Sequence, residues 1–262
     1  MRRVLVATAV VAALLGADQA ASPTSAGPFD QPANPCLGPG GFTLLCPDLE
    51  MYPPYDLYSE RTRTGRVRLR AGNVIESSGR GPVELRGRRS GARTMSVRQR
   101  IYRSDGSRLD VRTDGKLFFK AVPGQGRYWK FLHAARFELW SRAADGRLKD
   151  LVRTGPKVSY CFRDLRRVEP SPASPKKPFY PACSQDPDEQ AVTLGTSVGW
   201  GDVYPATYNE QWIDVTGLRG RFAYVHIADP KNTIFESDEG NNRARVNVRL
   251  PYPVKTKPDS GY

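Results

Sequence analysis

The sequence predicts an all-β protein, an antiparallel β-sandwich with long loops that forms a single domain after a signal peptide. From residue 46 onward, short runs of alternating apolar and polar residues recur along the chain, and turn residues separate them. No long amphipathic helix and no internal repeat interrupts this pattern. About 235 residues follow the expected leader, which is enough for one large β domain.

The start of the chain has the features of a secretory signal peptide. Two arginines precede a run of about a dozen apolar residues and then small residues, and such a run is too short to span a bilayer. We therefore expect a signal peptide over residues 1–26, cleaved after Ser22 or Ala26, and a secreted protein with no membrane span. Residues 27–45 are rich in Pro and Gly and predict an irregular lead-in, followed by a β domain over 46–252 and a tail over 253–262.

Ten runs have the alternation of half-buried strands. They cover residues 66–77, 82–89, 95–104, 109–121, 128–142, 150–162, 211–218, 221–229, 233–237 and 243–250. Turn residues predict hairpins at 104–106, 114–115 and 145–146, and the proline-rich residues 169–181 predict a loop. Within 128–142, a period of two places His133 on the face of Trp129 and Phe137, so we expect a core residue or one that supports a neighbouring site.

The four cysteines suit an oxidising compartment. Cys36, Cys46, Cys161 and Cys183 allow three pairings, of which we favour the local pairs Cys36–Cys46 and Cys161–Cys183. None of them has the CxxC spacing that a zinc or redox site would need.

The chain carries a formal charge of +13, and arginine is dense between Arg61 and Arg112. A basic secreted protein tends to adhere to anionic cell-wall polymers or to other extracellular proteins, and we expect partners of that kind. The alternative is that these arginines only occupy the solvent faces of strands. No nucleic-acid-binding motif is present, so nucleic acid is not an expected partner.

Oxygen-bearing side chains are crowded into the run 232–248. Glu236, Asp238, Glu239, Asn241 and Asn242 lie within seven residues, and calcium takes six to eight oxygen ligands. This loop could supply about half of such a shell. The alternative is a turn in which Asp and Asn satisfy backbone groups.

A second acidic run, 46–58, contains Asp48 next to a cysteine, and Asp48 could complete a site shared with the C-terminal loop. Nucleophilic hydrolysis has no support, because the chain has only two histidines, His133 and His226, and no GxSxG motif.

Three segments together resemble the lysyl oxidase family, including its bacterial members. They are "CPDLEMYP" (46–53), "GPKVSYCFRD" (155–164) and "GWGDVYPATYNEQWIDVTGLRGRFAYVHIADPKNTIFESDEGNN" (199–242). The resemblance extends over residues 44–250. It implies the fold of a secreted copper amine oxidase, an enzyme that converts lysine side chains of proteins to aldehydes. By the same resemblance, a quinone cofactor, lysine tyrosylquinone, would form from Lys157 and Tyr204. The implied calcium ligands are Asp48, the Leu49 carbonyl, Glu236, Asp238, Asn241 and Asn242.

The copper ligands of the family are three histidines spaced two apart after a tryptophan. When Trp129 is aligned with that tryptophan, the three positions hold Ala135, Phe137 and Leu139. A second register places Gly126, Tyr128 and Lys130 there, and again no histidine is present. We therefore expect no standard copper site. A different metal arrangement would have to involve His133, His226 or Tyr208, and otherwise Lys157 and Tyr204 are structural.

These observations favour a secreted, calcium-stabilised lysyl-oxidase-like protein that is divergent or non-catalytic and binds wall or matrix components. The first alternative is an active copper and quinone amine oxidase with an unorthodox metal site. The second is an Ig-like adhesion module, because residues 220–242 also resemble bacterial Ig-like adhesion domains.

Overall fold

The structure, a computed structural model, describes residues 33–254. The expected signal peptide, part of the lead-in and most of the expected tail lie outside these residues. Residues 31–262 form one compact unit, to which the following description applies. Within residues 33–254, no helix has the length and apolar character needed to cross a membrane.

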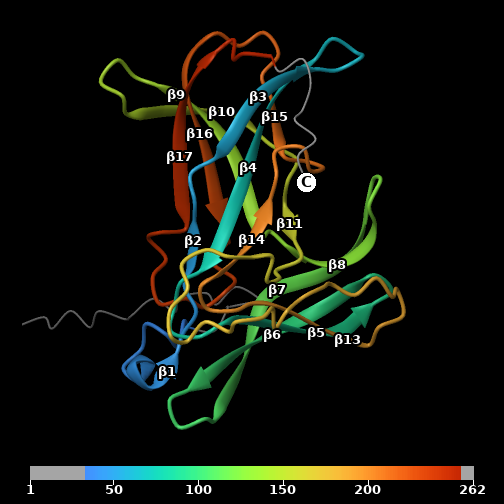
Figure 1. The fold of residues 1–262 in the computed structure, drawn as a ribbon, viewed down its shortest axis with the longest axis vertical. Coiled ribbons are helices and arrows are strands. Elements are labelled where there is room, and N and C mark those ends of the chain that lie inside the picture. Colours follow the sequence, from blue (N-terminus) through green and yellow to red (C-terminus); the bar gives the residue numbers. More distant parts are fainter. Residues whose placement is uncertain (1–32, 255–262) are drawn as a thin grey trace, which may run out of the picture. The chain divides into compact units, whose positions relative to one another are not determined.

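The largest sheet has seven strands, ordered β11-β8-β7-β6-β5-β13, with β1 paired to β6 (Figure 1). Its strands are β1(Leu44–Leu45), β5(Val83–Gly91), β6(Thr94–Arg103), β7(Arg108–Val122), β8(Gly126–Leu132), β11(Ser159–Tyr160) and β13(Ala191–Thr196). A short 3-10 helix, η1(Gly41–Thr43), precedes β1.

Two further sheets complete the fold. One has the order β10-β9-β16-β17, and the other has the order β12-β14-β4-β15 with β2 and β3 also paired to β4. Their strands are β2(Leu49–Met51), β3(Tyr55–Arg61), β4(Val67–Ser77), β9(Ala135–Arg142), β10(Leu148–Thr154), β12(Arg166–Arg167), β14(Trp200–Tyr204), β15(Trp212–Asp214), β16(Gly220–Ala228) and β17(Arg243–Leu250). All pairs of named strands are antiparallel, for example β4 with β14 and β16 with β17.

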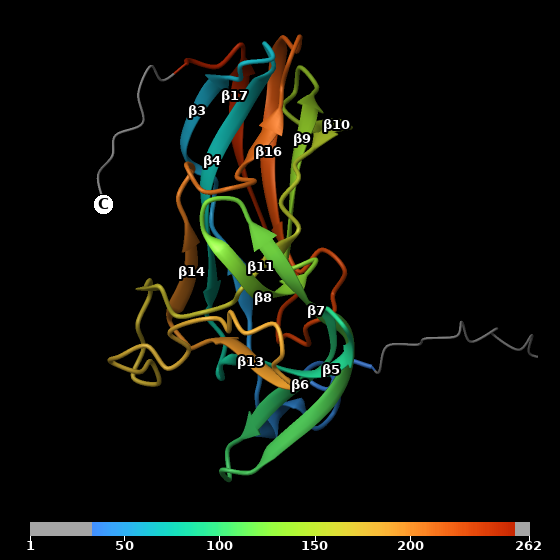
Figure 2. The same ribbon diagram turned by 90° about the vertical axis from the view of Figure 1, so that its right-hand side faces the viewer.

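The sheet of β9, β16 and β17 packs face to face against the sheet built on β4 (Figure 2). Leu69 and Ile75 of β4 share one buried cluster with Phe137, Tyr224 and Val248 of the facing sheet. In β17 buried and exposed residues alternate toward the end of the strand, whereas β4 and β16 are buried on both faces over most of their length, as central strands between packed layers are. The prediction of an all-β sandwich is therefore confirmed.

Most of the predicted strands and turns are present. The runs 66–77, 82–89, 95–104, 221–229 and 243–250 match β4, β5, β6, β16 and β17 within a few residues. The hairpin turns at 104–106 and 145–146 are confirmed, with Gly106 and Gly146 at positive φ. The runs 150–162 and 211–218 are strands only in part, because β10 ends at Thr154, β11 begins at Ser159 and β15 spans three residues.

The prediction of one strand over 128–142 is wrong. The chain turns at His133, whose φ of 61° lies in the left-handed region, and this turn divides the run into β8 and β9. β8 pairs with β7, whereas β9 pairs with β16 in a different sheet. Trp129 and Phe137 therefore do not share one sheet face, because a strand that changes sheets must bend at the corner.

The hairpin predicted at 114–115 is also wrong, because β7 continues through both residues. The register of β7 against β6 shifts between Ser96 and Arg98, which marks a bulge at this point. A Cβ atom on Gly115 would lie 2.5 Å from the ring of Phe131, so this glycine serves close packing rather than a turn.

Residues 233–237 are not a strand as predicted but belong to the loop between β16 and β17. Side chains satisfy the backbone of this segment in place of a neighbouring strand. The backbone N–H of Ile234 donates to Asp229 at 2.6 Å, and that of Phe235 donates to Gln99 at 2.7 Å. Both favoured disulfides, Cys36–Cys46 and Cys161–Cys183, are confirmed.

Candidate functional site

A buried cluster of amines and tyrosines lies where β14 ends and β11 begins. Lys157 precedes β11, and its Nζ lies 4.2 Å from the centre of the Tyr204 ring at the end of β14. The same Nζ lies 4.7 Å from the ring centres of Tyr160 and Tyr208. Only 1% of Lys157 and 4% of Tyr204 are exposed. The two residues that the resemblance pairs are thus neighbours, enclosed by aromatic rings.

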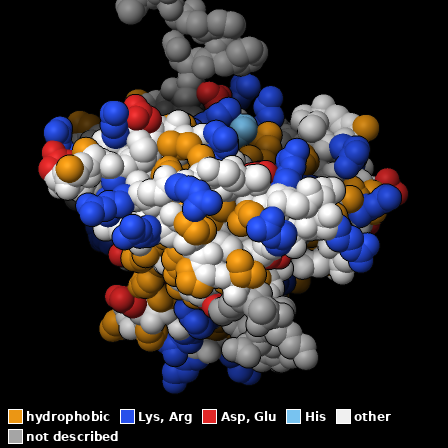
Figure 3. Space-filling model, turned by 90° about the horizontal axis from the view of Figure 1, so that it is seen from above, with side chains coloured by type: hydrophobic (Ala, Val, Ile, Leu, Met, Phe, Trp, Pro, Cys, Tyr) orange, Lys and Arg blue, Asp and Glu red, His pale blue; other side chains and the backbone are white. Residues whose placement is uncertain are grey.

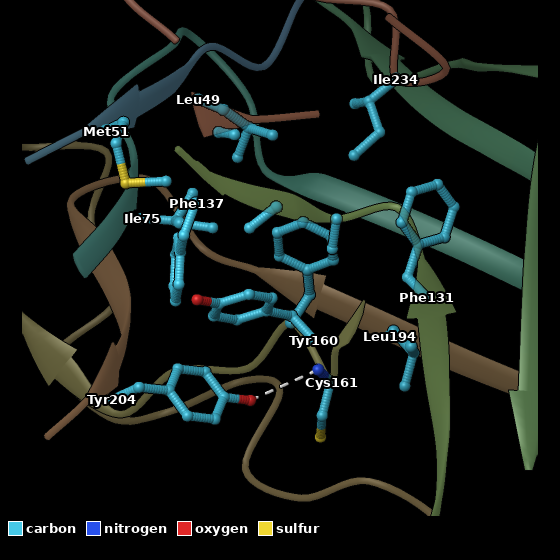
Figure 4. Close-up of a cluster of buried hydrophobic side chains, with 14 of the residues drawn as sticks. Leu49, Met51, Ile75, Phe131, Phe137, Tyr160, Cys161, Leu194, Tyr204 and Ile234 are labelled. Carbon is cyan, nitrogen blue, oxygen red and sulfur yellow. Dashed lines mark hydrogen bonds between the residues drawn. The ribbon is translucent and has the colours of Figure 1, made fainter. Parts of the chain in front are cut away.

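Hydrogen bonds fix the orientation of the tyrosines. The Cys161 backbone N–H donates to the Tyr204 hydroxyl at 3.5 Å, as Figure 4 shows. The Tyr160 hydroxyl donates to Asn73 at 2.8 Å, and Gln211 donates to the same Asn73 oxygen at 3.1 Å. These buried hydrogen bonds hold the Tyr160 ring in place, although the Asn73 amide nitrogen and the Gln211 amide oxygen have no partner among the described residues.

Burial dominates the electrostatics of Lys157. It lowers the pKa of the Lys157 amine well below its usual range, and the nearby charge of Lys130 lowers it further. The same loss of hydration raises the pKa of Tyr204 well above that of a free phenol. The fold therefore favours a neutral amine beside a neutral phenol.

A second lysine faces the same ring. Lys130 of β8 is 2% exposed, and its Nζ lies 5.8 Å from the centre of the Tyr204 ring and 5.7 Å from that of Tyr208. Burial lowers the pKa of Lys130 to about 8, although the charge of Asp202 opposes this shift. Lys130 is thus the more readily protonated of the two buried amines.

Asp202 is the anion of the cluster. It is completely buried on β14, and burial raises the pKa of its carboxyl to about 7, while Arg163, Lys130 and Lys157 act in the opposite direction. Neither carboxylate oxygen has a well-formed hydrogen bond within residues 33–254. The carboxyl of Asp202 therefore titrates near neutral pH, and the positive charges near it favour its ionised form.

A small cavity of about 80 Å³ opens beside the rings. It is lined by Gln125, Tyr128, Lys130, Cys161, Arg163, Tyr204 and Tyr208. Pockets for drug-sized ligands measure roughly 300–1,000 Å³, so this cavity has room only for a few waters or a very small molecule.

The histidines lie away from these residues. His226 of β16 is fully buried and stacks on Phe137, with 3.9 Å between ring centres, and both of its ring nitrogens lack hydrogen-bond partners within the described part of the chain. His133, at the corner between β8 and β9, is partly exposed and is therefore not the packed core residue that strand periodicity predicted. The structure thus brings Tyr208, but neither histidine, to the ring of Tyr204.

The acidic loop between β16 and β17 meets the start of β2. The Glu236 carboxylate, completely buried, accepts hydrogen bonds from the Leu49 backbone N–H and, at 2.9 Å, from Asn242. Asn241 donates to Asp48 at 3.1 Å. Asp48, Leu49, Glu236, Asn241 and Asn242 thus form one connected group. The bond from Leu49 uses its N–H, whereas the expected ligand was its carbonyl.

Asp238 is less closely involved. Its side chain is exposed and accepts a hydrogen bond from Gly240 in its own loop at 2.7 Å, so its role here is that of a turn residue. Glu239 joins the group instead, because Asn242 and Asn34 both donate to its carboxylate.

Within residues 33–254, no Lys or Arg side chain forms an ion pair with Glu236 or Glu239. Burial raises the pKa of Glu236 well above its usual range, and burial followed by the charges of Asp229 and Asp48 raises that of Glu239 to about 7. The side-chain amide oxygens of Asn241 and Asn242 are buried with no hydrogen-bond partner in residues 33–254. Buried acceptors and repelling carboxylates fit a hard cation such as calcium.

Carboxylates alone would not suffice for that cation. Among the described residues, no three His, Cys, Asp or Glu side chains form a group that could hold a metal ion. Calcium also uses amide oxygens, and the side-chain amide oxygens of Asn241 and Asn242 are the atoms that this loop leaves without partners among the described residues.

The model of the lysyl oxidase family matches residues 132–255. The resemblance to the lysyl oxidase family is confirmed over this segment. The match contains Lys157, Tyr204 and the loop over 236–242, and it includes the segment that also resembles Ig-like adhesion domains. It begins after Asp48 and after Lys130. No curated protein sequence matches the chain.

The match to the lysyl oxidase family makes it important where the structure places the two sets of positions considered for the copper ligands. Ala135, Phe137 and Leu139 lie on β9, buried between sheets. Tyr128 and Lys130 of β8 line the cavity beside Tyr204. Of the two registers, only the second therefore lies next to the candidate cofactor residue Tyr204. Neither residue is a histidine, and the copper ligands of lysyl oxidases therefore do not fit here.

Sequence reasoning on this lysyl-oxidase-like chain missed several residues of the site. Asp202 precedes Tyr204 by two residues on β14, so period two could have placed both on one face. Tyr160 and Arg163 follow Lys157 closely along the chain, but their approach depends on how β11 folds back. Lys130 appeared only as a residue that cannot replace histidine, and its burial next to Tyr204 required the structure.

Proposed function

We propose that this chain is a secreted, calcium-stabilised lysyl-oxidase-like protein that binds extracellular proteins or anionic wall polymers and does not oxidise amines. The protein keeps the fold and the Lys157–Tyr204 pair of the family. At the position of the copper ligands it carries other side chains, among them Lys130. The two disulfides support an extracytoplasmic location.

One observation carries the proposal, the place of Lys130. It stands in the only register that faces Tyr204, and its amine lies 5.8 Å from that ring. A lysine amine in this position takes the space of a metal ion. In its protonated form it also repels the metal ion electrostatically. Asp202 and the buried tyrosines then surround the ammonium group of Lys130 in place of a metal ion.

The acidic loop supports the calcium part of the proposal. Glu236, Asp48 and Glu239 would supply carboxylate oxygens, and Asn241 and Asn242 would supply amide oxygens. A bound cation would compensate the repulsion between the carboxylates and would join the β16–β17 loop to the start of β2.

Peptide mapping of the secreted full chain after incubation with Cu(II) in air tests the central claim. We expect the peptides containing Lys157 and Tyr204 to be recovered without a crosslink. The variant Tyr204→Phe, which has no phenol to oxidise, provides the baseline. A crosslinked peptide in the wild type, absent in Tyr204→Phe, would show that the protein builds the family cofactor.

The second candidate, an active amine oxidase, rests on the 4.2 Å between the Lys157 amine and the Tyr204 ring. It requires stoichiometric copper, a quinone that stains on a denatured blot, and release of hydrogen peroxide from a lysine-containing peptide. Absence of all three from copper-loaded protein excludes this candidate.

A further inference from the structure

Three arginines stand side by side on the solvent face of the largest sheet. Arg86 of β5 lies directly opposite Arg98 of β6, and Arg98 lies directly opposite Arg112 of β7. Directly opposite side chains have Cβ atoms about 5 Å apart. The row therefore places three like charges within about 10 Å across the sheet.

The acidic residues near this row have other partners. Glu84 accepts hydrogen bonds from the hydroxyls of Tyr102 and Tyr180 at 2.7 and 2.8 Å. Asp110 is bound at two atoms by Arg100, at 2.7 and 2.8 Å. Arg86 has only a distant contact with Glu84, at 3.9 Å.

No carboxylate within residues 33–254 forms an ion pair with Arg98, Arg112 or the neighbouring Arg88. The charge of this face is therefore not balanced internally. Lys and Arg side chains also occur on the face seen from above in Figure 3, but there they are dispersed among neutral groups.

A depression lies over Arg86 and Arg98 of this row, and Arg112, directly opposite Arg98, lies outside its lining. It has a volume of about 350 Å³, and its lining residues are Arg86, Gly87, Arg88, Arg98, Arg100, Asp110, Ala191, Val192 and Thr193. Four guanidinium groups thus converge on one hollow, and the hydroxyl-bearing Thr193 lies opposite Arg86 on β13.

Like charges directly opposite on neighbouring strands destabilise a sheet unless an anion lies between them. We infer that this hollow, the arginine face, binds a linear polymer that carries phosphate groups. The inference rests on the proposed function and names the surface and the chemistry of the partner. Successive phosphates of one chain would meet successive arginines along the row.

Phosphate suits this geometry better than carboxylate. The free oxygens of a phosphodiester accept hydrogen bonds from several directions, so arginines on three strands can share one chain. A carboxylate accepts best in its own plane and is matched by a single guanidinium, as Asp110 is by Arg100.

Binding of poly(glycerol phosphate) to the secreted full chain at physiological ionic strength tests the inference. The variant Arg86→Gln/Arg98→Gln/Arg112→Gln removes the row. The matched control, Arg221→Gln/Arg245→Gln/Arg249→Gln, removes the same charge from exposed positions of β16 and β17. Polygalacturonate provides carboxylates at similar density, dextran is the neutral polymer, and thermal melting verifies that each variant is folded.

We expect the row variant to bind poly(glycerol phosphate) about tenfold or more weakly than the control variant, because several charge-assisted hydrogen bonds are lost. Equal weakening in both variants would show that total charge, not the arginine face, governs binding, and would overturn the inference while a wall-binding function stands. Tighter binding of polygalacturonate would overturn the choice of phosphate. Detection of the Lys157–Tyr204 crosslink would contradict the proposed function separately, whatever the polymer result.

Discussion

The amine of Lys157 lies 4.2 Å from the centre of the Tyr204 ring, within a core that excludes water from both. A protonated amine in this position would gain a cation–π contact, but burial favours its neutral form. Folding therefore removes a proton from Lys157. This deprotonation lowers the free energy of unfolding, and the loss can be measured.

We expect Lys157→Met to stabilise the protein by about 1–3 kcal/mol near neutral pH, because Met fills a similar volume without a group that must be neutralised. The folded pKa of Lys157 lies below the unfolded value of 10.5. The unfolded chain therefore binds the extra proton between the two values, and wild-type stability rises with pH in that window. The gain from Lys157→Met should shrink toward pH 10 in urea unfolding measurements. Lys149→Met, at an exposed ion pair, should change little.

His226 should make the protein sensitive to acid. Burial lowers its pKa to about 3, so the unfolded chain protonates first, and stability is lost as pH falls from about 6.5 toward 3. The variant His226→Phe keeps the stacking on Phe137 but has no group to protonate. Its free energy of unfolding should therefore lack this pH dependence, which amounts to about 1.4 kcal/mol per pH unit. Unfolding free energies of both proteins between pH 4 and pH 7 measure the difference. Parallel pH profiles would contradict the assignment, and His133→Asn, at the partly exposed corner between β8 and β9, is the control.

Calcium should raise the melting temperature, and Glu236→Gln should abolish most of the rise. A site saturated at a hundredfold excess over Kd adds about 3 kcal/mol of stability. Without calcium, Glu236 is protonated on folding because burial raises its pKa, so stability falls as pH rises above 4.5. The shift caused by calcium should therefore grow as pH rises above 4.5. Asp105→Asn, on the exposed β6–β7 turn, should keep the full response, and an unchanged wild-type melting temperature after EDTA treatment would exclude the site.

Gly115→Ala should destabilise the protein by about 1–3 kcal/mol, because the new methyl group would overlap the Phe131 ring in a packed core. Gly40→Ala, where a Cβ meets nothing within 4 Å, is the matched control and should be nearly neutral. The double variant Gly115→Ala/Phe131→Leu should recover part of the loss. Chemical denaturation measures all three, and a neutral Gly115→Ala would contradict the reason given for the glycine.

The fold was predictable where side-chain alternation decides it. The period of two located β17, whose residues alternate between buried and exposed positions, and it also located β4 and β16, although both faces of these two strands are buried over most of their length. It failed at His133, where the pattern of apolar residues continues but the backbone bends. At 114–115 the period of two was right, and the turn residues were misleading, because β7 continues through them with a bulge. The period of two failed again at 233–237, where Asp229 and Gln99 satisfy the backbone from a distance in sequence.

The site was predictable only in part. The neighbours Lys157 and Tyr204 come from the resemblance to lysyl oxidases, and the acidic loop is visible as local crowding of oxygens. The burial of Lys130 and Asp202 depends on how β8 and β14 approach each other, and no local pattern encodes that approach. The arginine row likewise depends on strand register, which sets the partners across β5, β6 and β7.

The corner at His133 limits how this scaffold could be engineered. Imidazoles grafted after the corner, at 135, 137 and 139, would be sealed between two sheets, as His226 already is. Before the corner, Tyr128 and Lys130 accept such grafts, but Gly126 has a φ of 111°, which strains any other residue. A designer who wishes to install redox chemistry beside Tyr204 therefore has two usable positions on β8 and must recruit the third ligand from another strand.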